Sequence, residues 1–171
     1  LMSKKVLVAI ADGIEELEAV TIIDVLRRAG AEVTAASVNG EGVTASRGVK
    51  LVSDALIGDC VEETYDMIVL PGGMPGAEHL RDNEELAGLL KAQAESGRYY
   101  AAICASPAVV FQNHGLLEGK KATCYPSLAS QLRDISDGKV VVDGNCITSQ
   151  GPGTALGFAL KLVEVLFDEE K

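Results

Sequence analysis

Short apolar runs alternate with longer, helix-like segments along the whole sequence, and this alternation constrains the fold most strongly. Each apolar run has the length of a buried strand and stops at glycine, proline or a polar turn. Parallel strands need long crossover connections, so the pattern predicts an α/β fold, a mainly parallel sheet with helices on both faces. The predicted strands cover residues 4–10, 31–38, 65–73, 99–104 and 139–149, and the predicted helices cover residues 14–30, 82–97 and 153–167.

A shorter segment, residues 42–54, has the pattern of two short strands around a turn near Arg47 and Gly48. The length of 171 residues suits one domain with a substantial core. No internal repeat, low-complexity stretch or linker divides the sequence. We therefore expect a single domain over residues 1–171.

Composition excludes several classes of function. A net charge of −10 disfavours nucleic acid and anionic membrane surfaces as partners, and no apolar run approaches the roughly 20 residues of a membrane span. Four cysteines are widely spaced, without a zinc-binding pattern: Cys60, Cys104, Cys124 and Cys146. Because no secretory signal is visible either, we expect free thiols, no metal or other cofactor, and a cytoplasmic location. Leu1 precedes Met2, so an organelle location after removal of a transit peptide stays open.

Cys104 lies where the apolar run at 99–103 meets a helix-like run that begins near Pro107. Small neighbours such as Ala102 and Ala105 tolerate a sharp turn, and such a strand–turn–helix arrangement resembles a nucleophile elbow. A thiol at a helix N-terminus has a lowered pKa and therefore a larger thiolate fraction. The alternative is a packed structural cysteine, which position alone does not exclude.

Glu18 lies on the apolar stripe of the first predicted helix, within about 40° of Ile14 and Ile22 on the helical wheel. A carboxyl group on a buried face tends to stay protonated, so it can donate a hydrogen bond to a thiolate or a substrate oxygen. Glu16 points almost the opposite way, as a solvated acid would. For Glu15 and Glu16 we expect a first-turn role in stabilising the helix dipole.

Backbone N–H groups after two strands are candidates for an oxyanion hole. Gly72 and Gly73 follow the strand at 65–70, where glycine lets the backbone approach a ligand closely, and Ala105 adjoins Cys104. An ordinary turn is the alternative. The segment around Thr154 offers a helix N-terminus to an anion, but a capped and tightly turned helix start is the favoured interpretation.

The remaining polar candidates are weaker. We expect His79 on a surface loop, within reach of the site, and His114 near a helix C-terminus about 15 Å from Cys104. Cys124 and Cys146 lie in apolar, strand-like runs and are expected in the core, and Cys60 is expected to be unreactive.

Four motifs in order, at residues 10–20, 70–80, 101–110 and 148–160, resemble the ThiJ/PfpI superfamily and within it the DJ-one branch, that of the parkinsonism-associated deglycases. The resemblance implies a flavodoxin-like three-layer sandwich and a homodimer. It also assigns the nucleophilic, oxidation-prone cysteine to Cys104 and the protonated glutamate to Glu18. By the same resemblance Gly72 and Gly73 are oxyanion glycines, and Arg47 and Arg28 lie near the dimer interface and the mouth of the site. For Arg28 the alternative is a cation in the last turn of its helix, where it stabilises the helix dipole.

Two departures from the family pattern bear on function. Tyr125 stands where many relatives have a histidine, and a phenol with a pKa near 10 is a poor base at neutral pH, so Tyr125 is expected at most as a hydrogen-bond donor. Ala105 stands where the protease-like branch has a histidine, so protease activity is not expected.

The residues and the resemblance together leave two hypotheses. The first is a glutathione-independent glyoxalase or deglycase that acts on methylglyoxal-like dicarbonyls through Cys104 and Glu18. The second is an oxidative-stress sensor or chaperone that works by oxidation of Cys104 to a sulfinate.

Overall fold

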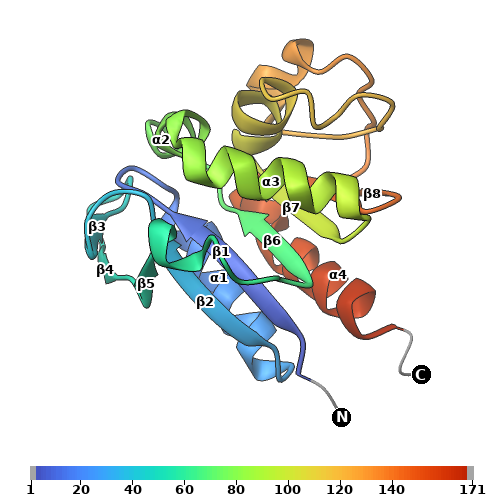
Figure 1. The fold of residues 1–171 in the computed structure, drawn as a ribbon. Coiled ribbons are helices and arrows are strands. Elements are labelled where there is room, and N and C mark those ends of the chain that lie inside the picture. Colours follow the sequence, from blue (N-terminus) through green and yellow to red (C-terminus); the bar gives the residue numbers. More distant parts are fainter. Residues whose placement is uncertain (1–2, 169–171) are drawn as a thin grey trace.

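The computed structural model describes residues 3–168 and is built on a seven-stranded sheet, with the strand order β5-β2-β1-β6-β7-β9-β8 (Figure 1). Only β8 is antiparallel to its neighbour. With the two-residue edge strand β5 set aside, the parallel strands β2-β1-β6-β7-β9, counted along the chain, have the order 2-1-3-4-5 of flavodoxin-like folds. The strands are β1 (Lys5–Ile10), β2 (Glu32–Ser37), β5 (Ala55–Leu56), β6 (Met67–Leu70), β7 (Tyr99–Ile103), β8 (Val140–Asp143) and β9 (Cys146–Ser149).

Helices cover both faces of this sheet, which confirms the predicted α/β fold with its three layers (Figure 1). On one face α1 (Glu16–Arg28) packs against α4 (Ala155–Phe167), and on the other lie α2 (Gly76–Asp82) and α3 (Glu84–Ser96). The two central strands, β1 and β6, are buried on both faces, which explains why they are continuous apolar runs in the sequence.

Local signals in the sequence set the ends of α3. Its N-cap is Asn83, whose side chain accepts a hydrogen bond from the N–H of Leu86 at 2.8 Å. Its C-cap is Gly97, which has a φ of 86° and so adopts the left-handed conformation that favours glycine. The helix predicted over residues 82–97 is therefore confirmed.

Two segments differ from the local expectations. Residues Pro107–Gln112, after β7, form a π-helical segment instead of the regular helix that the apolar pattern suggests. Cys124 is buried as expected but is not on a strand, because the segment around it makes only an isolated bridge between Ala122 and Ile135.

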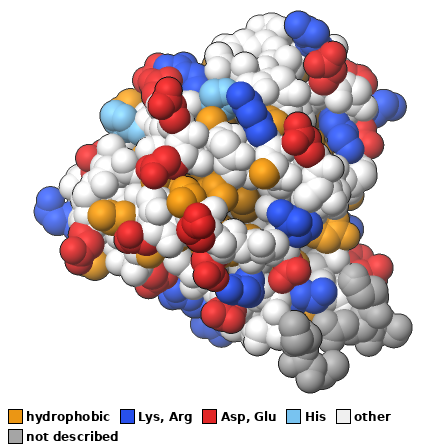
Figure 2. Space-filling model, in the orientation of Figure 1, with side chains coloured by type: hydrophobic (Ala, Val, Ile, Leu, Met, Phe, Trp, Pro, Cys, Tyr) orange, Lys and Arg blue, Asp and Glu red, His pale blue; other side chains and the backbone are white. Residues whose placement is uncertain are grey.

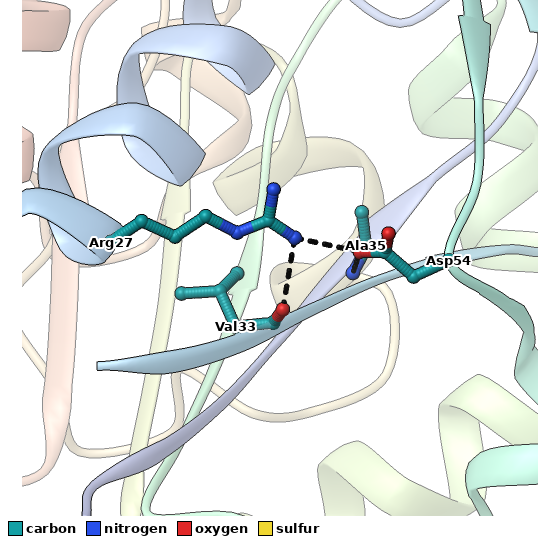
Figure 3. Close-up of polar contacts among 4 residues, drawn as sticks. All are labelled: Arg27, Val33, Ala35 and Asp54. Atoms are coloured by element: carbon teal, nitrogen blue, oxygen red, sulfur yellow. Dashed lines mark hydrogen bonds and ion pairs between the residues drawn. The ribbon is translucent and has the colours of Figure 1, made fainter. Parts of the chain in front are cut away.

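The predicted pair of short strands is confirmed as a hairpin of β3 (Gly42–Thr44) and β4 (Lys50–Val52). The connection after this hairpin is fixed to the sheet edge by Arg27 and Asp54 (Figure 3). Arg27 Nη2 donates to Asp54 Oδ2 at 2.8 Å and to the carbonyl of Val33 at 3.0 Å, and the N–H of Ala35 donates to the same Oδ2 at 2.9 Å. Because both side chains are half exposed, the ion pair contributes about 1 kcal/mol at most.

Figure 2 shows acidic side chains interspersed with Lys and Arg over the face that carries α3. Within residues 3–168, no helix combines the length and the hydropathy that a membrane span requires.

Candidate functional site

The candidate site lies at the carboxyl ends of β1, β6 and β7. The strand order reverses between β1 and β6, because β2 and the short β5 lie on one side of β1, whereas β6, β7 and β9 lie on the other. In open α/β sheets ligands bind at such a switch point. A cavity of about 350 Å³ opens there, and among the residues that line it are Ser46, Arg47, Gly73, Cys104, Ala105 and Tyr125.

Cys104 occupies a strained turn at the end of β7. Its φ is 65°, and it is the one non-glycine residue with a positive φ in the described part of the chain. This conformation costs of order 1–3 kcal/mol and persists only where neighbours hold it. The Cys104 N–H donates to the carbonyl of Ser149 at 3.0 Å, and its own carbonyl accepts from the N–H of Tyr125 at 2.7 Å. The predicted sharp turn is confirmed.

Gly72 permits the close approach of β6 and β7 at this point. A Cβ atom on Gly72 would lie 2.4 Å from the Cβ of Cys104, a distance that no real pair of carbon atoms tolerates. The turn at Cys104 can therefore pack this closely only because residue 72 is a glycine.

Glu18 is completely buried beside Cys104 and Gly72, as its place on the apolar stripe predicts. Its Oε1 accepts a hydrogen bond from the N–H of Gly72 at 2.8 Å. Its Oε2 is buried and has no conventional hydrogen-bond partner within residues 3–168, while the carboxyl group interacts with the thiol of Cys104. Burial raises the pKa of Glu18 to about 7, so the group still holds its proton in part of the molecules at neutral pH.

The expected lowering of the Cys104 pKa is wrong. Burial, and then the charge of the Glu18 carboxylate, raises the pKa of Cys104 to about 12. A short π-helical segment after the turn does not offset the desolvation of the thiol. The two groups behave as one pair, because a proton on Glu18 removes the like charge that opposes ionisation of Cys104.

Two backbone N–H groups interact favourably with the sulfur of Cys104, those of Gly73 and Ala105. Gly72 differs from the expectation, because its N–H is engaged by Glu18 and faces the acid rather than the cavity. The donors at the sulfur are therefore Gly73 and Ala105, whereas Gly72 fixes the carboxyl group.

Arg47 and Arg28 lie in different parts of the structure. Arg47 lines the cavity with Cys104, as expected. Arg28 does not, because it lies in the last turn of α1, pairs with Asp24 one turn earlier and borders the groove between α1 and α4. Its expected place at the mouth of the site is wrong for a single chain. Tyr125 does line the cavity, with 44% of its surface exposed.

Glu16 also departs from the expectation. It is only 8% exposed, and its carboxylate accepts hydrogen bonds from the turn of the β3–β4 hairpin. Burial raises the pKa of Glu16, but hydrogen bonds from its own backbone N–H and from the N–H groups of Val49 and Arg47 bring that pKa below the ordinary value. Glu15 is the N-cap of α1, and its side chain accepts from the N–H of Leu17 at 3.2 Å. Glu15 therefore has the expected first-turn role, and it also lines the cavity, where its Oε1 accepts from the hydroxyl group of Ser46 at 3.4 Å.

Neither histidine borders the cavity. His79 is exposed on α2 rather than on a loop, and the ring of His114 lies 2.8 Å from the carbonyl oxygen of Arg81, at the C-terminal end of the same helix. Placement of His114 near a helix C-terminus is confirmed, although the carbonyl that it contacts belongs to α2.

Thr154 is structural, as favoured. Its hydroxyl group bonds with Ser149 at 2.7 Å and with the N–H of Gly151 at 3.1 Å, so it closes the turn before α4. Cys60 and Cys146 are buried, like Cys124.

Other residues of the cavity wall escaped prediction, because they come from distant segments. Met74 contributes from the turn before α2, and Ser127 and Pro152 contribute from two short 3-10 helices, Pro126–Gln131 and Pro152–Thr154. Only the proline in the turn before α4 gave a local signal, and that signal indicated a turn rather than a site.

The fold and the site together define an α/β protein with a thiol on a strained turn, beside a buried acid, at the switch point of a flavodoxin-like sheet. The chain belongs to the DJ-1/PfpI family, because the model of that family matches residues 4–165. Its relatives place it in the DJ-1 branch.

Three similar proteins show the extent of the match. Protein DJ-1 homolog B of Arabidopsis thaliana is 56% identical, over 98% of this chain and 39% of that protein. The solved structure of oxidized Toxoplasma gondii DJ-1 is 53% identical, with a TM-score of 0.96 over 98% of this chain and 93% of that one. A Caenorhabditis elegans relative named glutathione-independent glyoxalase DJR-1.2 is 38% identical over 92% of this chain and 85% of its own length. The chain spans 39% and 44% of the two Arabidopsis relatives, DJ-1 homologs B and A.

Proposed function

We propose that this chain is a glutathione-independent glyoxalase that converts methylglyoxal-like dicarbonyls to hydroxy acids. The observation that carries the proposal is the pairing of Cys104, which lines the cavity, with the buried carboxyl group of Glu18 beside it, whose pKa is about 7. A pKa near neutrality suits a group that must both give and take a proton. The name of the Caenorhabditis elegans relative supports the same chemistry.

The proposed reaction uses the pair in sequence. The Glu18 carboxylate takes the proton of the Cys104 thiol as the sulfur attacks the aldehyde carbon. The carbonyl electrons move to the aldehyde oxygen, and the proton then passes from Glu18 to that oxygen to complete the hemithioacetal. The Gly73 and Ala105 N–H groups stabilise the negative oxygen during this attack. The Glu18 carboxylate then takes the proton from the former aldehyde carbon and returns it to the neighbouring carbon. The hydroxyl proton of the hemithioacetal passes to the oxygen on that neighbouring carbon, which yields a lactoyl thioester. Water hydrolyses the thioester to lactate and frees the thiol.

Tyr125 and Arg47 are accessory groups in this proposal. Both line the cavity, where the Tyr125 hydroxyl group can donate a hydrogen bond to a substrate oxygen. The same thiol and acid, acting on a carbonyl adduct of a protein side chain, would make the chain a deglycase.

A lactate assay tests the proposal. Purified protein should form lactate from methylglyoxal without glutathione, Cys104→Ser should form none, and Glu18→Gln should lose at least about a hundredfold in kcat/KM. Cys60→Ser changes a buried thiol outside the cavity and serves as the matched control, with unchanged turnover. Lactate formation by Cys104→Ser at the wild-type rate contradicts the proposal.

We propose an oxidative-stress sensor or chaperone as the second candidate function, in which Cys104 becomes a sulfinate. A protonated Glu18 next to the sulfur is suited to hydrogen-bond a sulfinate oxygen, and the similar Toxoplasma gondii structure carries the description oxidized. Mass spectrometry after mild peroxide should find two added oxygens on Cys104 before any on Cys124 or Cys146. Earlier oxidation of Cys124 argues against a sensor role.

We further propose a homodimer that uses the groove between α1 and α4. Exposed apolar side chains from both helices border it, among them Val20 at 45% and Leu160 at 55% exposure. A second copy would cover these side chains and bring its own Arg28 into the interface.

A further inference from the structure

Glu16 is a buried carboxylate whose hydrogen bonds, apart from one with its own backbone N–H, go to a single turn. Its two oxygens each accept from the N–H of Arg47 at 3.0 Å, and Oε2 also accepts from the N–H of Val49 at 3.2 Å. Its Oε1 accepts from the hydroxyl group of Ser46 at 3.2 Å. A carboxylate that is only 8% exposed needs such donors to remain charged.

That turn is the tip of the β3–β4 hairpin and forms one wall of the cavity over Cys104. Ser46 and Arg47 both line the cavity. The base of the hairpin is tied independently to the loop before α1, since the N–H of Thr44 donates to Asp12 Oδ1 at 2.9 Å and the N–H of Ser46 donates to the carbonyl of Ile14 at 2.8 Å. Glu16 supplies the contacts that reach past Ser46 into the tip.

We propose that Glu16 is a positioning residue, which fixes the hairpin tip as a wall of the Cys104 cavity. Glu16 acts through Ser46 and Arg47 and does not touch the reacting atoms. The first turn of α1 then serves the site twice, because Glu18 holds the proton next to the thiol while Glu16 holds the wall opposite. The kinetic part of the inference rests on the proposed glyoxalase function, whereas the structural part does not.

Glu16→Gln tests the structural part, with Glu41→Gln as the matched control. Glu41 is exposed immediately before β3, so the control removes the same charge from the same hairpin without touching its tip. Amide hydrogen exchange of Arg47 and Val49 should accelerate about tenfold or more in Glu16→Gln and stay unchanged in Glu41→Gln. Equal exchange in Glu16→Gln and the wild type would overturn the inference.

Two further measurements connect the hairpin tip to the site. Because a loosened wall shields Cys104 less, its alkylation by iodoacetamide should be at least about twofold faster in Glu16→Gln. KM for methylglyoxal should rise about threefold or more while kcat stays within about twofold, because Cys104 and Glu18 are unaltered. An unchanged alkylation rate, or an equal fall in kcat and kcat/KM, overturns the positioning role.

The outcomes separate this inference from the proposed function. If the wild type forms no lactate, the glyoxalase proposal fails, and exchange together with alkylation still decides whether Glu16 positions the wall. If lactate forms and the exchange rates do not differ, the positioning role fails alone.

Discussion

Replacement of Glu18 by glutamine should change how the stability of the protein depends on pH. In the folded protein the pKa of Glu18 is about 7, compared with 4.5 for an ordinary glutamate. The folded state therefore binds a proton more tightly than the unfolded chain does. Stability that this group contributes is fully present below about pH 4.5 and is lost as the pH rises through 7.

The expected size follows from the difference in pKa. A difference of about 2.5 units corresponds to roughly 3 kcal/mol of unfolding free energy between the two limits. Glutamine does not titrate, and its carbonyl oxygen can still accept the hydrogen bond that Glu18 takes from the N–H of Gly72. The Glu18→Gln variant therefore keeps the hydrogen bond from the N–H of Gly72 and removes only the ionisation of residue 18.

Urea unfolding of wild type and Glu18→Gln, at a series of pH values from about 4.5 to 8, measures this difference. The unfolding free energy of the wild type, minus that of Glu18→Gln, should fall by roughly 3 kcal/mol across the series. The same comparison with the exposed Glu41→Gln should stay nearly flat. A difference between wild type and Glu18→Gln that varies by less than about 1 kcal/mol, or that grows with pH, refutes the reasoning that Glu18 is a buried, proton-holding acid.

Three further predictions follow from contacts in the structure. Gly72→Ala should abolish lactate formation and lower the melting temperature, because its Cβ would lie 2.4 Å from that of Cys104; a fully active variant would contradict the geometry. Thr154→Val should lower the unfolding free energy by about 1–3 kcal/mol in urea titrations, since it removes the hydroxyl group that bonds with Ser149 and Gly151. Leu160→Glu, on the exposed face of α4, should shift sedimentation from dimer to monomer, and a wild type that sediments as a monomer argues against the dimer.

Local patterns in the sequence predict much of the fold and the burial of Glu18. Helical periodicity placed Glu18 on the buried face of α1, and the small residues around Cys104 indicated the sharp turn that its φ of 65° confirms. Both signals lie within a few residues of the group concerned, so they do not depend on the rest of the fold.

The remaining features depend on segments distant in the sequence. Glu16 looks solvated on a helical wheel, but the β3–β4 hairpin folds over it and supplies donors from residues about thirty positions later. The pKa of Cys104 was misjudged because burial and the Glu18 carboxylate decide it, and neither is visible in the residues next to Cys104. Arg28 was assigned to the site by resemblance, whereas its helix places it in the groove between α1 and α4.

The central claim is that Cys104 attacks the carbonyl substrate and that Glu18 handles the proton. Mass spectrometry of protein quenched during turnover of methylglyoxal tests it most directly, because a covalent intermediate must appear on the nucleophile. The account predicts a mass increase of one methylglyoxal on the peptide that contains Cys104, and none on the peptides of Cys60 and Cys124. Steady formation of lactate with Cys104 unmodified, and undiminished in Cys104→Ser, would contradict the account.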